Sequence, residues 1–460
     1  MDAKQSLTAL WCNLGLPAEA LDRVSLTGRD PVLPSSFHVG QMAQVTIGAA
    51  ALAAAELHRR RTGTAQNVTV DARNAAIEFR SERYCRVDGG QAPELWDKIA
   101  GAYRCGDGGW VRIHTNFPHH RDGVLTLLGC AYDRKAVGDA LQDWTAEKFE
   151  DAAAKSGLVV AKARSFAEWD AHPQGQAVQA LPLIALEQIG DGPKLLLQPG
   201  SRPLDNIRVL EMTRVLAGPI CGRTLAAHGA DVLRVISPQL PTIEEADIDT
   251  GRGKRSAHVD LTTDDGASDF RTLLGGADIF LQSYRPGAVA RRGFGPSEAA
   301  AIRPGIVCVS LSAYGQAGPW AERRGFDSLV QTSTGLNDAE AKAAGETGLR
   351  PLPCQAIDHA SGYLMALGSM AALLRRIDEG GSWHVRVSLA RTGHWFRQMG
   401  RVANGFDAPD IEFAQIADRL TSQHSGYGTL QAVSHAAVLS ETPAQWARPS
   451  VPFGTDPPRW

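Results

Sequence analysis

The sequence predicts an α/β protein with a doubly wound, mostly parallel, Rossmann-like sheet and a second, smaller α+β domain. In residues 204–404, short apolar runs alternate with helical stretches. Alternation of this kind is typical of a parallel sheet covered by helices on both faces. Residues 83–189 differ, because a glycine-rich turn between two short strands is followed by helices. That order predicts the smaller domain.

The large domain begins with a strand, a helix and a second strand. Ile207 to Met212 is a buried strand, a turn at Ala217 opens a helix that runs to His228, and Asp231 to Ile236 is the next strand. Later elements continue the alternation. We expect strands at His258 to Leu261, Ala277 to Gln282, Gly305 to Ser310 and Trp383 to Leu389, and a long helix that Asp358 opens and that covers Gly362 to Ile377.

Residues 1–82 are predicted to form a helix and strand that pair with the large domain as a degenerate repeat of residues 350–395. Residues 48–71 and 368–389 share one order: a helix of small residues, a basic end, glycine, a polar turn and a strand. An ungapped alignment places Gln41 opposite Asp358, and a three-residue shift places His38 there instead. Neither residue is a carboxylate.

Two further segments complete the predicted organisation. Residues 190–203 have glycine and proline at both ends and are the expected linker between the small and the large domain. Residues 405–460 are weakly patterned and end in a proline-rich run, so we expect a C-terminal tail that wraps over the surface.

Composition and charge exclude several classes of function. The chain has 460 residues and a net charge of −3, so it has no bulk cationic field for nucleic acid. Its start has no apolar run long enough for a signal peptide or membrane helix, which predicts a cytoplasmic protein without membrane contact. Seven scattered cysteines without CxxC, and the absence of HExxH, predict no metal site.

A series of motifs resembles the class III CoA-transferase family of formyl-CoA transferases, carnitine CoA-transferases and α-methylacyl-CoA racemases. The opening LDNIRVLEMTRVLAGP starts at Leu204, and further motifs follow in the family's order: Gly229-Ala230-Asp231-Val232, Gly253-Lys254-Arg255-Ser256, Arg285-Pro286-Gly287, Gly315-Gln316-Ala317-Gly318-Pro319, Gly325-Phe326-Asp327, and Asp358 with Ser361-Gly362. The preceding third resembles the family's later half, so the halves stand in permuted order. The resemblance implies an enzyme, and a homodimer as its assembly.

The resemblance also implies the substrates and the site. Partners would be an acyl-CoA and a small carboxylic acid, with the CoA thioester as substrate and no permanently bound cofactor. Asp358 takes the family's nucleophile position, where a carboxylate forms an anhydride and then a thioester with CoA. By the same resemblance, CoA would be contacted by Leu216, Ala217, Lys254, Arg255, Tyr284 and Arg291.

Other interpretations remain open at this point. Spacing alone makes Asp358 a helix cap, since aspartate is a favoured N-cap residue. The racemase branch needs a histidine beside the aspartate of the Gly325-Phe326-Asp327 motif, and Phe326 cannot carry a proton. A non-catalytic CoA-binding homologue is the third interpretation. A nicotinamide enzyme is disfavoured, because the first strand–helix turn lacks GxGxxG.

Overall fold

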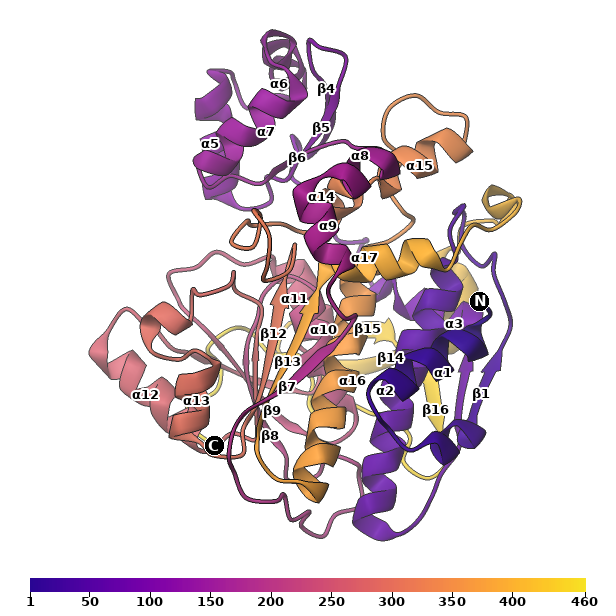
Figure 1. The fold of residues 1–460 in the computed structure, drawn as a ribbon, viewed down its shortest axis with the longest axis vertical. Coiled ribbons are helices and arrows are strands. Elements are labelled where there is room, and N and C mark those ends of the chain that lie inside the picture. Colours follow the sequence, from indigo (N-terminus) through magenta and orange to yellow (C-terminus); the bar gives the residue numbers. More distant parts are fainter.

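A computed structural model, which describes residues 1–460, confirms the α/β class and the doubly wound sheet. The central sheet has seven strands in the order β10-β9-β8-β11-β12-β13-β7, and only β7 is antiparallel to its neighbour (Figure 1). The order reverses between β8 and β11, so ligands are expected at that point, outside the carboxyl ends of the strands. The strands are β7 (Ala185–Gly190), β8 (Arg208–Met212), β9 (Asp231–Ile236), β10 (Lys254–His258), β11 (Ile279–Gln282), β12 (Val307–Ser312) and β13 (Ser382–Ser388).

Helices cover both faces of this sheet because its strands are apolar on both sides. In β8, Val209 packs into the cluster that holds α10 (Ala217–Ala227) and α16 (Ala356–Asp378). The next residue, Leu210, packs with α12 (Asp264–Gly275) and α13 (Pro296–Ile302) on the opposite face. Alternation along a strand therefore divides the core into two layers.

Several element boundaries differ from the sequence prediction by one to four residues, and two of them concern candidate site residues. The third strand covers Lys254–His258 instead of residues 258–261, because Thr263 caps α12 and the residues just before it form the entry to that helix. The long helix begins at Ala356, with Gln355 as its N-cap residue, so Asp358 does not open it.

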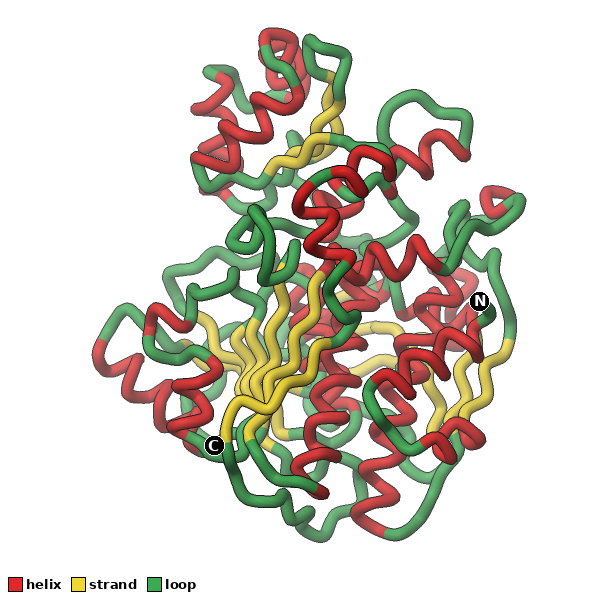
Figure 2. The backbone as a smooth tube through the Cα atoms, viewed as in Figure 1, coloured by secondary structure: helices red, strands yellow, loops and turns green.

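The N-terminal segment repeats part of the central sheet. Its β1 (Val24–Thr27) and β2 (Val68–Asp71) pair in parallel, and β16 (Ala437–Leu439) adds an antiparallel strand to β2. The central sheet has the same pattern: β12 and β13 pair in parallel, and β7 pairs with β13 in the antiparallel direction. The two groups of strands are separate in Figure 2. Helices follow in matching places: α2 (Val39–Thr62) and α3 (Ala72–Glu78) in the first unit, α16 and α17 (Leu389–Gln398) in the second.

The starts of α2 and α16 have the same backbone geometry. The N-cap residue of α2 has φ −76° and ψ 60°, and that of α16 has φ −77° and ψ 61°. Asp30 accepts hydrogen bonds from the backbone of Gly40 and Gln41 in the first turn of α2. Gln41 and Asp358 are thus both the third residue of their helix. The Gln41 amide donates to Met1 O and Ser6 Oγ, so the N-terminus fills this position.

The small domain lies above the carboxyl ends of the central sheet (Figure 1). Its sheet comprises β4 (Gly101–Arg104), β5 (Trp110–Ile113) and β6 (Val160–Lys162), and a separate apolar core joins that sheet to its helices. These helices are α5 (Pro118–Leu128), α6 (Arg134–Ala140) and α7 (Ala146–Lys155). α8 (Phe166–Ala171) and α9 (Pro173–Gln179) lead back to β7, so residues 185–189 lie in the large sheet although the sequence suggested the small domain.

The remaining elements connect these units. Residues 191–200 have no helix or strand, and the last 56 residues contain β14 (Leu420–Ser425), β15 (Gly428–Val433) and β16. β15 pairs with β3 (Arg86–Val87), which ties the tail to the first third of the chain. The other helices are α1 (Ala3–Asn13), α4 (Ser81–Tyr84), α11 (Glu244–Thr250), α14 (Asp327–Ser333) and α15 (Leu336–Ala343). None of the helices combines the length and apolar character that a membrane crossing requires.

Candidate active site

A cavity of about 630 Å³ opens at the carboxyl ends of the central strands. Residues that follow each strand line it: Arg214 after β8, Ser237 after β9, Val259 after β10, Ser283 after β11 and Ala313 after β12. Phe117, His119 and His120, at the start of α5, line it from the small domain. The position between two domains, at the reversal of strand order, is the expected place for a ligand.

Asp358 lines this cavity from the first turn of α16. It is not the N-cap residue, which is Gln355, and the Gln355 side chain makes no capping hydrogen bond. The Asp358 carboxylate accepts no hydrogen bond from the protein, although the residue is only 7% exposed. The capping role that spacing suggested therefore does not account for this side chain, which remains available to a ligand.

Asp327 supports the start of α16 and was not among the predicted site residues. Its Oδ2 accepts the backbone N–H of Asp358 at 2.8 Å, and its Oδ1 accepts the amide of Gln331. Asp30 makes the corresponding contacts to α2. Asp327 stands 31 residues before Asp358, so no helix rule connects the two, and only the motif Gly325-Phe326-Asp327 could have drawn attention to it.

Both carboxyl groups have raised pKa values. Burial, followed by the charges of Asp327 and Glu82, holds the pKa of Asp358 well above the usual range. Burial also raises the pKa of Asp327, to about 6, although the hydrogen bonds that it accepts oppose this rise. A perturbed carboxyl group in a cavity is typical of a functional site.

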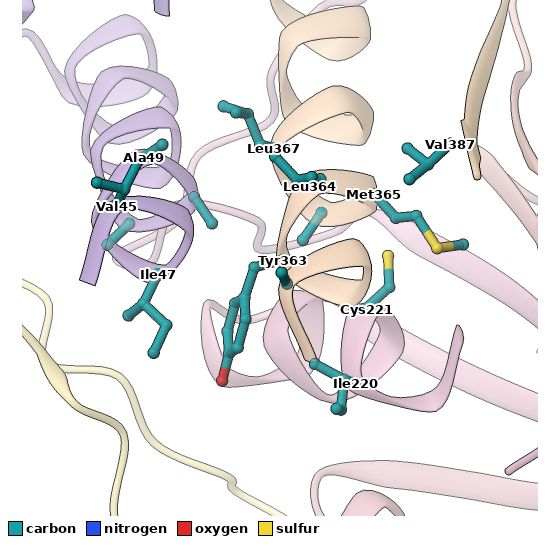
Figure 3. Packing of buried hydrophobic residues seen from close by; sticks show 14 of the residues in the cluster. Val45, Ile47, Ala49, Ile220, Cys221, Tyr363, Leu364, Met365, Leu367 and Val387 are labelled. Carbon is teal, nitrogen blue, oxygen red and sulfur yellow. The ribbon is translucent and has the colours of Figure 1, made fainter. Parts of the chain in front are cut away.

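α10 and α16 approach each other closely beside Asp358. A Cβ atom added to Gly362 would lie 2.6 Å from the carbonyl oxygen of Ala217 and 2.7 Å from Ile220 Cγ2. Asp358 and Gly362 are four residues apart and share a helix face, so Asp358 lies next to the start of α10. Figure 3 shows Ile220 of α10 beside the second turn of α16. The small residues of α10 thus allow α16 to pack closely against it.

The start of α10 faces the cavity without a side-chain cap. Leu216 is its N-cap residue, and both Leu216 and Ala217 line the cavity. The preceding Val215 has φ 71°, which a β-branched residue rarely adopts. Such strain is concentrated at functional sites, and here it accompanies uncapped backbone N–H groups beside Asp358.

The lining is strongly cationic. It contains two aspartates, Asp260 and Asp358, and six arginines: Arg214, Arg285, Arg291, Arg292, Arg323 and Arg324. Tyr284 also lines the cavity, and burial raises the pKa of its hydroxyl. The excess of positive charge suits a ligand with several phosphate groups.

The structure thus brings Asp358, Leu216, Ala217, Tyr284 and Arg291 to one cavity, but not Lys254 and Arg255. These two residues begin β10 and lie at the amino end of that strand, whereas the cavity lies at the carboxyl ends of the strands. Lys254 is buried, with its ammonium 2.7 Å from Glu211 Oε2. Arg255 forms an ion pair with Asp231. Both cations are occupied by carboxylates within the protein.

Several proteins are similar in sequence to this chain. A probable fatty acyl-CoA transferase of Mycobacterium tuberculosis is 32% identical over 41% of this chain and 51% of its own length. An acyl-CoA transferase of Gibberella moniliformis is 28% identical over 72% of this chain and 66% of its own. A succinate–glutarate CoA-transferase of Agrobacterium fabrum is 31% identical over 41% and 51%, respectively. The chain therefore spans about half to two thirds of these relatives.

A solved structure of a CAIB/BAIF family protein from Brucella suis is 28% identical, with a TM-score of 0.39 over 42% of this chain and 55% of that chain. Residues 23–195 and 204–456, which together cover most of the sequence, match the family model described as CoA-transferase family III. The chain therefore belongs to CoA-transferase family III.

Proposed function

We propose that the protein moves CoA from an acyl-CoA to a small carboxylic acid, with Asp358 as the nucleophile. The observation that carries this function is the Asp358 carboxylate, which lines a cationic cavity and has no hydrogen-bond partner in the protein. The names of the relatives, which include acyl-CoA and succinate–glutarate CoA-transferases, support the same reaction class.

The reaction divides into balanced covalent steps. The ionised Asp358 attacks the thioester carbonyl, the C–S bond breaks, and a mixed anhydride and CoA thiolate form. The thiolate attacks the aspartyl carbonyl, which gives an aspartyl-CoA thioester and frees the donor acid. The acceptor carboxylate then attacks this thioester, its C–S bond breaks, and a second mixed anhydride and CoA thiolate form. The thiolate attacks the acceptor's acyl carbonyl, which gives the new acyl-CoA and breaks the bond to Asp358. Asp358 is regenerated as a carboxylate, and no other reactant is consumed.

The start of α10 can stabilise the negative charge that develops on the carbonyl oxygen. Uncapped N–H groups and the positive end of the helix dipole favour an oxyanion nearby. The close approach at Gly362 supports this geometry because it holds the starts of α10 and α16 together.

CoA binding is assigned to the cations that line the cavity. Arg291, with Arg285 and Arg292, comes from the segment after β11, and the three can neutralise the phosphates. Tyr284 offers a ring for the adenine. This assignment leaves out Lys254 and Arg255, whose ion pairs occupy them elsewhere.

The setting of the reaction is also proposed. Free thiols at all seven cysteines support a reducing compartment such as the cytoplasm. A homodimer remains the assembly to test, by light scattering of the purified chain.

A racemase of the same family is the alternative with the least support. Racemisation needs an acid and a base on opposite faces of the α-carbon. Phe326 lines the cavity at the position where that branch carries histidine, and a phenyl ring cannot exchange a proton.

Trapping of the covalent intermediate tests the proposed reaction. Incubation with acyl-CoA followed by hydroxylamine should convert Asp358 to a hydroxamate, detected by mass spectrometry of the peptide. D358N should be inert, whereas D378N, at the exposed end of the same helix, should react normally. Unchanged transfer by D358N would exclude the covalent mechanism. CoA binding without any modification would favour a non-catalytic homologue.

A further inference from the structure

The N-terminal repeat contacts the first two turns of α16, which carry Asp358. Glu82 of α4 has its Oε2 3.0 Å from His359 Nε2, and Glu78 of α3 accepts from the Tyr363 hydroxyl at 2.7 Å. His359 directly follows Asp358, and Tyr363 lies one turn further along the helix. The repeat therefore reaches the turn that carries the proposed nucleophile.

The direction of the Asp358 carboxylate depends on this turn. The carboxylate has no hydrogen-bond partner in the protein, so no contact of its own fixes it. Asp327 accepts the backbone N–H of Asp358 at 2.8 Å and holds the turn at one point. The contact between Glu82 and His359 holds it at a second point, which limits rotation of the turn about the helix axis.

His359 is held on two sides. Its ring is stacked on that of Phe79 with the ring centres 5.2 Å apart, and its Nε2 faces Glu82. The side chain is fully buried, and its Nδ1 has no partner in the protein. Nε2 is therefore the one ring atom that ties this turn to α4 through a hydrogen bond.

Glu82 is ionised although it is buried. Burial on its own would raise the pKa of its carboxyl group, but the charge and hydrogen bond of His359, followed by the charge of Arg83, lower that pKa below its usual value. An ionised carboxylate only accepts, so His359 Nε2 donates to it. Hydrogen bonds to an ionised partner are about twice as strong as neutral ones. The same negative charge acts on Asp358, whose pKa is raised by burial and then by the charges of Asp327 and Glu82.

We propose that Glu82 and His359 are positioning residues for the transfer reaction, through which the N-terminal repeat orients the turn of Asp358 and adds a negative charge beside it. This inference rests on the proposed function, because it takes Asp358 as the reacting group. Neither residue lines the cavity, so neither contacts the substrate. Misplacement of a reacting group by about 1 Å can slow a reaction about a hundredfold, so a small rotation of the turn is sufficient to change the rate.

A purely structural role is the alternative. The contact between Glu78 and Tyr363 joins the same repeat to the same helix and is also buried, but it lies one turn away from Asp358. If both contacts only hold the repeat in place, loss of either should have the same effect on the reaction. If His359 positions the nucleophile, only its contact should determine the rate.

The test measures formation of the aspartyl-CoA intermediate in a single turnover, by rapid quench at saturating acyl-CoA. H359L should lower this rate constant more than about tenfold. The Kd of CoA, measured by calorimetry, should change less than about twofold, because the cations of the cavity are untouched. H359Q places an amide N–H near the position of Nε2 and should stay within about threefold of the wild-type rate. E82L/H359L leaves no unpaired charge in the interior, so it should fold and be as slow as H359L.

E82Q separates the hydrogen bond from the charge. The glutamine keeps an acceptor for His359 but is neutral, so the rate at high pH should be retained while its fall with decreasing pH shifts to lower pH. The other titratable groups that act on this part of the structure remain: Asp327 from α14, Cys354 before α16, Arg83 from α4, Asp249 from α11, and Arg112 from β5.

The matched control is Y363F, which removes the contact to Glu78. It should melt at a lower temperature but keep the single-turnover rate within about twofold. A rate in H359L equal to that of the wild type, or an equal loss in H359L and Y363F, would overturn the proposal. An H359Q protein as slow as H359L, or an unshifted pH profile in E82Q, would overturn it as well. A wild-type protein that forms no aspartyl-CoA would instead count against the proposed function.

Discussion

At the scale of residues, the two neighbouring carboxyl groups Asp327 and Asp358 have different roles. Asp327 accepts hydrogen bonds from backbone and side chain, and these stabilise its ionised form. Asp358 has no such partner and faces the cavity. Desolvation and the charge of Asp327 therefore make Asp358 harder to ionise than Asp327. Once it is ionised, the poorly solvated Asp358 carboxylate is a reactive nucleophile.

The raised pKa of Asp358 predicts a pH dependence of aspartyl-CoA formation. Only the ionised form attacks, so the single-turnover rate should fall by about tenfold per pH unit below this pKa. D327N removes the neighbouring charge but keeps an acceptor for the Asp358 N–H, and should shift this fall to lower pH. Rapid-quench measurements from pH 5 to pH 9 would show it. An identical profile for both proteins would contradict the coupling.

The same pKa predicts that D358N stabilises the protein. A carboxyl whose folded pKa exceeds its unfolded pKa contributes stability at low pH and loses it as the pH rises through the folded value. Each pH unit between the two values corresponds to about 1.4 kcal/mol. The melting temperature of D358N should therefore exceed that of the wild type at pH 8. The difference between the two melting temperatures should be smaller at pH 5. D378N, in which an exposed ion pair is lost, should show no such gain.

At the scale of elements, the contact between α10 and α16 determines where Asp358 lies. α16 is buried along nearly its whole length, between α10 and α2 (Figure 3). A helix that is buried all round has no polar face to relieve a steric change.

Gly362 provides the sharpest test of this contact. In G362A, the added methyl would meet the carbonyl oxygen of Ala217 and Ile220 Cγ2, and overpacking of this kind costs about 1–3 kcal/mol. The two helix starts must separate, so transfer should decrease more than tenfold even where the protein remains folded. Thermal melts and initial rates would measure both effects. G275A, where nothing lies within 4 Å of the new methyl, should leave both unchanged or slightly stabilised.

The sequence was informative where a local pattern determines the structure. Apolar runs located the strands, and the motif at Asp358 led to a residue that lines the cavity. Lys254 and Arg255 were assigned to CoA by the family resemblance alone, and the third strand, predicted four residues too late, in fact begins with them. A strand boundary decides which end of the sheet a side chain occupies, and its sequence signal is weak.

Local sequence patterns could not predict the contacts between segments that are distant in the chain. The support of α16 by Asp327 depends on a loop that closes over 31 residues. The approach of His120 to Phe326 joins the small domain to the large one, and the adjacent histidines His119 and His120 give no sign of it in the sequence. Such pairings follow from the packing of whole domains.

At the scale of the whole molecule, a buried polar network holds the N-terminal repeat against the large domain. Glu78 accepts from the hydroxyl of Tyr363 at 2.7 Å and from the backbone of Ala436 at 2.6 Å. Glu82 lies 3.0 Å from His359, the residue next to Asp358. Three parts of the chain, the repeat, α16 and the tail, thus meet in one desolvated cluster, and the site depends on their assembly.

Arg223 is the residue whose loss should test this dependence. Its guanidinium pairs with Asp249 and donates to Ser81 Oγ at 3.0 Å, fully buried, and its charge also lowers the pKa of Glu78. R223M leaves these carboxylates short of a countercharge, and removal of one partner of a buried pair costs about 3–5 kcal/mol. Chemical denaturation should show this loss. The double variant R223M/D249N should recover part of it, because the uncompensated charge is removed as well.

A matched surface change, R386M, breaks an exposed pair with Glu187 and should cost less than about 1 kcal/mol. If R223M were as stable as R386M, the network would not be what holds the repeat to the large domain.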